Sequence, residues 1–200
     1  MQLYYTNSQK PNGEQTKPSL SLGGYISGST IPNDLLNNII TDISRLAIDN
    51  NGKETIIIAL TNTLSNDVEN VKIWFEYPTD EEDNNASHVK LELAIVDPTV
   101  DDCGDYVFER LNSFSVSPLY ATFSEPNSNA NAINVGTIEA GKSVGIWIRK
   151  TINKTNASPL SCDQLYENFK NNVTLDNQQT IDFFIHYNEE NSVSISLSGI

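Results

Sequence analysis

The chain has 200 residues and a formal net charge of −14, from 26 acidic and 12 basic side chains. A field of that sign repels phosphate backbones, so we expect no nucleic-acid partner. The length suits one domain with a sizeable core, and no apolar stretch reaches the roughly 18 residues that indicate a membrane span.

The N-terminus shows no basic start followed by an apolar run, so we expect no signal peptide and a chain made in a cytoplasm. In that compartment the two cysteines, Cys103 and Cys162, are expected to be free thiols rather than a disulfide.

The first residues are predicted to lie outside the main domain. Residues 2–5 suit a short strand, but residues 7–19 contain Pro11, Pro18 and an Asn-Gly pair. Such residues favour turns and loops over regular structure. We therefore expect an extended, loosely held N-terminal arm over 1–19 and a single domain over 20–200.

A glycine-rich segment and a helix are expected next. Residues 19–32 hold three glycines, so their backbone should turn tightly or pass close to another backbone. In residues 33–45 leucine and isoleucine recur three and four apart, which predicts a short helix. A second helical excursion is predicted over 159–170 from the same spacing at Leu160, Leu165, Tyr166 and Phe169.

Short strands dominate the remainder. Residues 54–62 are apolar at consecutive positions, as in a central strand, whereas the other candidates alternate apolar and polar residues. These other candidates are 71–77, 88–96, 120–123, 133–138, 181–187 and 192–197. Residues 97–118 are expected to be irregular. The pattern predicts a mainly β chain, an antiparallel β-sandwich of immunoglobulin-like or jelly-roll-like type, with one or two short helices.

The most informative strand follows a turn at residues 139–142. Its apolar residues alternate and point one way: Val144, Ile146, Ile148 and Ile152. Trp147, the largest side chain of the strand, falls on the opposite face with Arg149. Something other than this strand's own core must therefore cover Trp147.

Two further strands repeat this placement. Trp74 shares its face with Lys72 and Glu76, and Phe184 shares its face with Asp182 and His186. Three covers remain open: the predicted helices or the N-terminal arm, a neighbouring subunit, or a sugar ring stacked on the aromatic side chain. Aromatic side chains mixed with arginine are typical of subunit interfaces.

Catalytic motifs are absent from the sequence. His88 and His186 each fall within a predicted strand, and we find no nucleophile elbow, zinc motif or phosphate-binding loop. Acidic residues 80–83 and those at Asp97, Asp101, Asp102 and Asp105 suit calcium chemically, but lack EF-hand spacing. We expect solvated acidic loops, no cofactor, no metal and no enzymatic activity.

Several segments in order resemble a group of bacteriophage virion proteins. They are GGYISG (23–28), IP (31–32), LNN (36–38), TNT (61–63), VKIW (71–74), FSEP (123–126) and VGTIEAGKSVGIWIRKTI (135–152). The resemblance covers roughly residues 20–75 and 118–155. The chain departs from the pattern at 37–43, which lacks a phenylalanine, and at 156–172, which resembles an insertion.

The resemblance implies a non-enzymatic structural component of a phage particle, in the tail, neck or collar, or capsid surface. Such a protein would assemble in the host cytoplasm, with copies of itself and other virion proteins as partners. The expected subunit interface contains Trp74, Trp147, Arg149, Lys150 and Phe184, with the two cations pairing acidic loops of the next subunit. The alternative function is a particle-displayed module that binds a host glycan through Trp74, Trp147 or tyrosine side chains, together with acidic loops.

Overall fold

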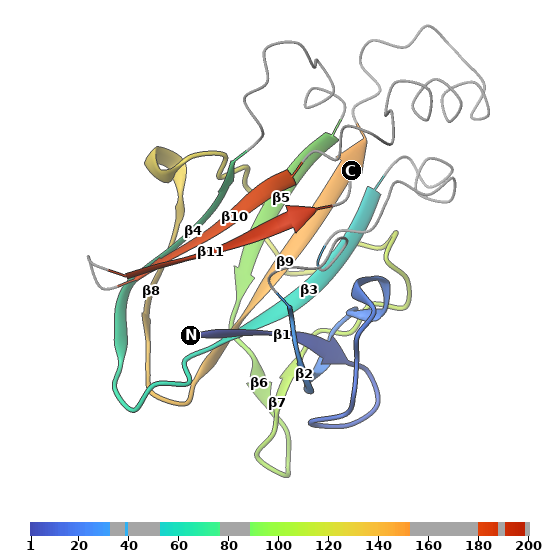
Figure 1. The fold of residues 1–200 in the computed structure, drawn as a ribbon. Coiled ribbons are helices and arrows are strands. Elements are labelled where there is room, and N and C mark those ends of the chain that lie inside the picture. Colours follow the sequence, from blue (N-terminus) through green and yellow to red (C-terminus); the bar gives the residue numbers. More distant parts are fainter. Residues whose placement is uncertain (33–38, 40–52, 77–88, 153–179, 188–190, 199–200) are drawn as a thin grey trace, which may run out of the picture.

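The chain folds as two antiparallel β-sheets that face each other across one core (Figure 1). The computed structural model describes residues 1–32, 39, 53–76, 89–152, 180–187 and 191–198. The prediction of a mainly β, antiparallel sandwich is confirmed. The predicted helices at 33–45 and 159–170 lie outside the described residues, apart from Ile39, which is buried in the core.

The larger sheet has seven strands in the order β5-β9-β3-β1-β2-β7-β6. Their bounds are β1 Gln2–Asn7, β2 Gly24–Thr30, β3 Lys53–Thr61, β5 Val89–Val96, β6 Thr99–Val100, β7 Tyr106–Phe108 and β9 Ser143–Ile152. The smaller sheet has the order β11-β10-β4-β8. Its strands are β4 Val68–Glu76, β8 Ile133–Ile138, β10 Thr180–Tyr187 and β11 Asn191–Ser198.

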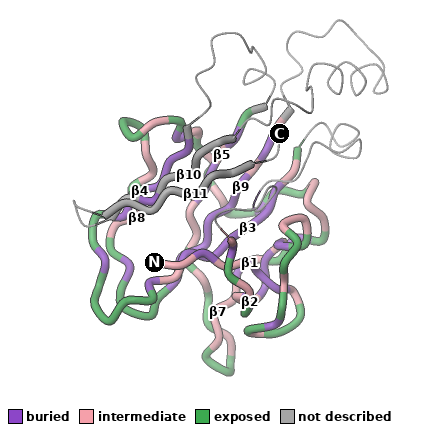
Figure 2. The backbone as a smooth tube through the Cα atoms, in the orientation of Figure 1, coloured by how far each residue is buried: buried purple, intermediate pink, exposed green. Residues whose placement is uncertain are grey.

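The main core lies between the two sheets. Alternation places Ile146 and Ile148 of β9 on its side of the larger sheet, and Ile73 and Phe75 of β4 on its side of the smaller one. All four side chains are at most 1 % exposed. In Figure 2 the buried stretches follow β3, β4 and β9, and the exposed ones gather in the connecting loops.

β3 confirms the prediction of a central strand. It pairs with β9 on one side and with β1 on the other. Ile58 faces the main core, whereas Ile57 and Ala59 belong to a second apolar cluster on the opposite face of the sheet. Because both faces of this strand are buried, consecutive apolar residues are needed along it.

The predicted N-terminal arm over 1–19 is wrong. β1 lies between β3 and β2 inside the larger sheet, and its Leu3 and Tyr5 are 2 % exposed. The chain then turns back, and the backbone N–H of Asn12 donates to the carbonyl of Ile26 at 3.0 Å. The proline and glycine content of this segment therefore encodes turns that are held against β2, and residues 1–19 belong to the sandwich.

Two buried hydroxyls fix β1 where its pairing with β2 is irregular. The backbone N–H of Thr6 donates to Oγ of Ser21 at 2.7 Å, and this hydroxyl donates to the carbonyl of Ile57 at 2.6 Å. Oγ1 of Thr6 in turn accepts from the N–H of Gly23 at 3.0 Å. These bonds satisfy buried backbone groups of Thr6, Gly23 and Ile57, and they join β1, β3 and the residue before β2.

Most of the remaining strand predictions are confirmed within one to three residues, and β8 matches 133–138. The predicted strand at 120–123 is wrong, because this stretch is irregular and only Ser124 bridges to Leu93. Residues 97–118 are irregular as expected, apart from the short β6 and β7.

The glycine-rich segment passes close to other backbone, as predicted. Gly23 has a φ of +98°, and a Cβ there would overlap the carbonyl oxygen of Glu109. Gly104 has a similar φ of +87°, yet its Cβ would meet open space. An alanine at Gly104 would therefore meet backbone strain alone, whereas an alanine at Gly23 would meet the same strain and steric crowding as well.

We predict that Gly104→Ala lowers the free energy of unfolding by about 1–2 kcal/mol, the cost of a left-handed backbone for alanine. Gly23→Ala should cost about 1–3 kcal/mol more, or prevent folding, because crowding adds to the same strain. Chemical denaturation of both variants measures the difference. Equal losses would mean that the approach of Gly23 to Glu109 is not tight.

Candidate functional site

Trp147 lies on the outer face of the larger sheet, turned away from the main core, and is nevertheless only 1 % exposed. It belongs to the second apolar cluster, whose buried members are Ile57, Ala59, Ala94, Phe108, Leu111 and Trp147. Phe108 and Leu111 come from residues 106–124, which we call the covering segment. Within the described residues, the same chain therefore supplies a cover for Trp147 through Phe108 and Leu111.

Backbone hydrogen bonds attach the covering segment to the sheet at several points. β7, at its start, pairs with β2. The N–H of Leu111 donates to the carbonyl of Leu22 at 2.8 Å, and the N–H of Thr55 donates to the carbonyl of Phe114 at 2.6 Å. At its end, Ser124 exchanges two bonds of 2.8 and 2.9 Å with Leu93. These bonds fix the covering segment across the outer face and pair part of its backbone polar groups.

Arg149 shares this outer face and holds the end of the covering segment. Its Nε donates to Oε2 of Glu92 at 2.8 Å, and its guanidinium carbon lies 3.9 Å from the centre of the Phe123 ring. Nζ of Lys90 lies 3.2 Å from Oε1 of Glu92 and 3.5 Å from Oε2 of Glu125. The arginine therefore joins a cation–π contact and an ion pair within one chain.

The pKa of Glu92 reflects these bonds. Burial alone would raise the pKa of this carboxyl, but hydrogen bonds from Arg149 and Lys90 outweigh it and hold the pKa below its ordinary 4.5. Glu92 is thus held in its charged form by the same groups that fix the covering segment.

Lys150 lies on the inner face, next in the chain to Arg149 but pointing the other way. Its side chain is 3 % exposed, and Nζ lies 2.7 Å from Oε2 of Glu54 on β3. Burial with an ion-pair partner places this ammonium inside the fold, away from the acidic loops of a neighbouring molecule. Its predicted role in pairing such loops does not fit this position.

The two other predicted interface residues lie in the smaller sheet. Trp74 is 7 % exposed, and its backbone pairs with that of Phe184 on β10. The side chain of Phe184, like those of His88 and His186, lies outside the described residues. The structure therefore brings Trp147 and Arg149 together under the covering segment and places Lys150 and Trp74 elsewhere.

The outer side of the covering segment carries apolar side chains that the sequence analysis did not single out. Leu119 is 80 % exposed, Tyr120 is 90 % exposed and Val116 is 46 % exposed. The N–H of Leu119 donates to both carboxylate oxygens of Glu109, at 2.9 and 3.1 Å, so this part of the loop is held in place. We call residues 116–120 the apolar loop.

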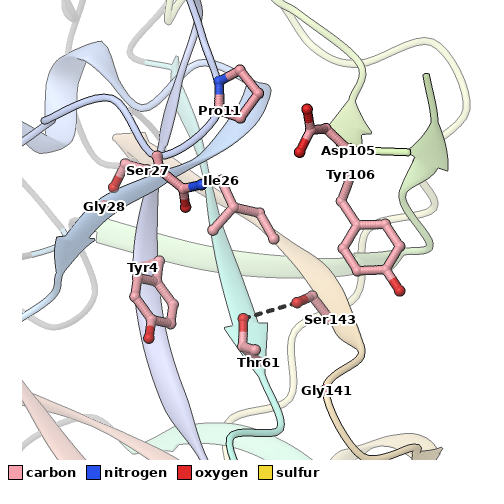
Figure 3. A pocket seen from close by; sticks show the side chains of 11 residues that line it. Tyr4, Pro11, Ile26, Ser27, Gly28, Thr61, Asp105, Tyr106, Gly141 and Ser143 are labelled. Atoms are coloured by element: carbon pink, nitrogen blue, oxygen red, sulfur yellow. Dashed lines mark hydrogen bonds between the residues drawn. The ribbon is translucent and has the colours of Figure 1, made fainter. Parts of the chain in front are cut away.

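A pocket of about 450 Å³ lies where β1, β2, β3 and β9 meet the start of β7 (Figure 3). Its lining residues are Tyr4, Pro11, Asn12, Ile26, Ser27, Gly28, Thr61, Asp105, Tyr106, Gly141 and Ser143. Tyr4 and Tyr106 stand on opposite sides of Ile26, and the hydroxyls of Thr61 and Ser143 are bonded at 2.8 Å. The covering segment with its apolar loop is the first candidate site, and this pocket is the second.

The acidic loop beside the pocket is closed by its own backbone. Oδ1 of Asp101 accepts the N–H groups of Asp105 and Cys103, each at 2.9 Å, and the bond from Asp105 is the largest of the effects that lower the pKa of Asp101. Within the described ranges, no group of three or more histidine, cysteine, aspartate or glutamate side chains is close enough to hold a metal ion. Acidic residues 80–83 lie outside those ranges. Cys103 is a free, exposed thiol.

Comparison with known proteins finds no matching family model, no matching curated protein and no matching solved structure. In the part of the chain that the structure describes, no helix has the length and apolar character of a membrane span.

We predict that Trp147→Ala lowers the free energy of unfolding by about 3–5 kcal/mol, because the indole is buried between the sheet and the covering segment. Tyr120→Ala, at an exposed position of the same segment, should change it by no more than about 0.5 kcal/mol. Urea denaturation of both variants makes the comparison. A small effect of Trp147→Ala would mean that the covering segment does not pack on the sheet.

The lowered pKa of Glu92 predicts a pH-dependent contribution to stability. The contribution is fully present above the unfolded pKa and is lost as the pH falls through the lower, folded pKa. Glu92→Gln should therefore cost about 1–3 kcal/mol at pH 7 and much less near pH 3. Denaturation curves across this range test it.

Glu125→Gln is the matched control, because Glu125 is more exposed and its carboxylate, among the described residues, pairs with Lys90 alone, at 3.5 Å. Its cost should stay below about 1 kcal/mol at both pH values. A loss for Glu92→Gln that does not change with pH would contradict the assignment of the ion pair.

Proposed function

We propose that this protein is a non-enzymatic structural component of a bacteriophage particle, in its tail, neck or collar, or capsid surface. It acts there through repeated contacts with copies of itself and with other virion proteins. The proposal rests on the ordered resemblance over residues 20–75 and 118–155, which includes β2, β3, β4, β8 and β9. These strands supply much of the core, so a shared sandwich is what such a resemblance would preserve.

The observation that carries the contact part of the proposal is the apolar loop. Exposed apolar side chains scattered over a surface need no explanation, but Val116, Leu119 and Tyr120 lie within five residues of one ordered loop. Tyrosine offers a large contact area at little cost in conformational freedom. The Glu109 carboxylate already orders Leu119, so docking there loses less entropy.

The net charge constrains the contact. Identical subunits that each carry −14 repel one another, so a contact between them needs an uncharged centre and specific pairing around it. The apolar loop supplies such a centre. A closed ring further requires this loop to meet a different patch on the next subunit, since ring contacts are heterologous.

We predict that the purified protein self-associates and that Leu119→Ser/Tyr120→Ser weakens the association at least about tenfold, the loss of a central apolar contact. The free energy of unfolding of the monomer should change by no more than about 0.5 kcal/mol, because both side chains are exposed. Native mass spectrometry over a concentration series measures the first quantity, and urea denaturation measures the second.

Leu64→Ser is the matched control, because Leu64 is also exposed, at 42 %, but lies in the loop between β3 and β4. It should leave the association unchanged. In phage particles that encode the chain, the double variant should be incorporated at a reduced copy number. A wild-type chain that is missing from purified particles would contradict the proposed function, and undiminished assembly of the double variant would contradict the proposed contact.

A further inference from the structure

The pocket described above shares no lining residue with the apolar loop, and the structural role proposed for the protein makes no use of it. Its floor is Ile26 of β2, and the rings of Tyr4 and Tyr106 stand to either side (Figure 3). Polar groups complete the lining: the amide of Asn12, the hydroxyls of Thr61 and Ser143, and the carboxylate of Asp105. The hydroxyl of Ser27 is not among them, because Ser27 is 1 % exposed and its Oγ is bonded to the backbone of Ser29. A volume of about 450 Å³ falls within the range of small-molecule sites. We propose that this pocket binds a neutral saccharide unit.

The mixture of donors and acceptors in the lining favours a sugar. A hydroxyl-rich ligand needs partners that both give and accept hydrogen bonds, and the amide and hydroxyl groups do both. Thr61 and Ser143 are bonded to each other at 2.8 Å, which leaves each oxygen further capacity. Within the described residues, no partner is bonded to the side chains of Asn12 and Asp105, so both are available to a ligand.

The charges argue against an anionic ligand. Of the described side chains that line the pocket, only Asp105 is charged, and the whole chain carries −14. A phosphate, a sulfate or an acidic sugar would be repelled. A cationic ligand would gain from Asp105, but it would leave the donor groups of Asn12 and the hydroxyls without acceptors, and the ammonium of Lys142 already lies 5.8 Å from the centre of the Tyr106 ring.

The pocket is formed before any ligand arrives. The N–H of Gly28 donates to the carbonyl of Gly13 at 3.1 Å, which holds the turn that carries Pro11 and Asn12 against β2. The N–H of Asp105 is fixed by Asp101 at 2.9 Å, and Tyr106 belongs to β7. A preformed site of this kind loses little conformational freedom on binding.

This site replaces the sugar platform that the sequence suggested at Trp147, because that indole is 1 % exposed and has no face open to a ligand. Binding at the pocket is measured on the isolated chain. Its outcome is therefore independent of whether the protein enters a phage particle.

The test begins with the full chain on an array that carries neutral and acidic glycans, followed by NMR titration with the free neutral oligosaccharide that gives the strongest signal. We expect a dissociation constant at or below about 1 mM, with shifts in the amides of Ile26, Ser27 and Gly28. Tyr106→Ala and Asp105→Asn should each weaken binding at least about tenfold, because each removes a group that faces the ligand.

Asp102→Asn is the matched control: it makes the same change in charge on an exposed neighbour outside the lining, and should leave affinity within about twofold. Amide spectra confirm that each variant is folded. The proposal is overturned if no neutral glycan binds, if binding survives both pocket variants, or if sialylated glycans or free choline bind more tightly than the neutral sugars.

Discussion

The packing of Trp147 beneath the covering segment is the contact on which the rest of the structure depends. A β-sandwich normally buries one face of each sheet and leaves the other to water. Here β3 and β9 bury both faces, one against the smaller sheet and one against residues 106–124. This second layer explains why β3 is apolar at consecutive positions and why a tryptophan stands on the polar side of β9.

The same contact produces the surface to which we assign subunit binding. Phe108, Leu111 and Phe123 point inward and anchor the covering segment, with Arg149 stacked on Phe123 at 3.9 Å. Because these anchors fix the backbone, Leu119 and Tyr120 are presented outward at defined positions. Two acidic side chains also help to fix the covering segment. Glu92 binds Arg149, and Glu109 binds the N–H of Leu119, so part of the negative charge is used to hold the chain together.

The sequence was sufficient where residues follow a simple period. Alternation placed Ile146 and Ile148 in the core. The same alternation places Lys150 on the inner face, although it was grouped with its neighbour Arg149 as an interface cation. The covering segment could not be predicted, because its backbone is irregular. Its position depends on bonds such as that between Leu111 and Leu22, which no local pattern reveals. The turns of residues 7–19 looked like a loose arm for a related reason, since proline and glycine mark a turn without showing what it packs on.

The central claim is that the chain itself closes the outer face of the larger sheet and that subunit contacts fall on the apolar loop. Hydroxyl-radical footprinting of side chains, on the dilute monomer and on the assembled protein, tests both halves together. We predict that Trp147 reacts slowly in both states and that Tyr120 reacts rapidly in the monomer and slowly after assembly. A Trp147 that reacts in the monomer and becomes protected on assembly, with Tyr120 unchanged, would contradict it.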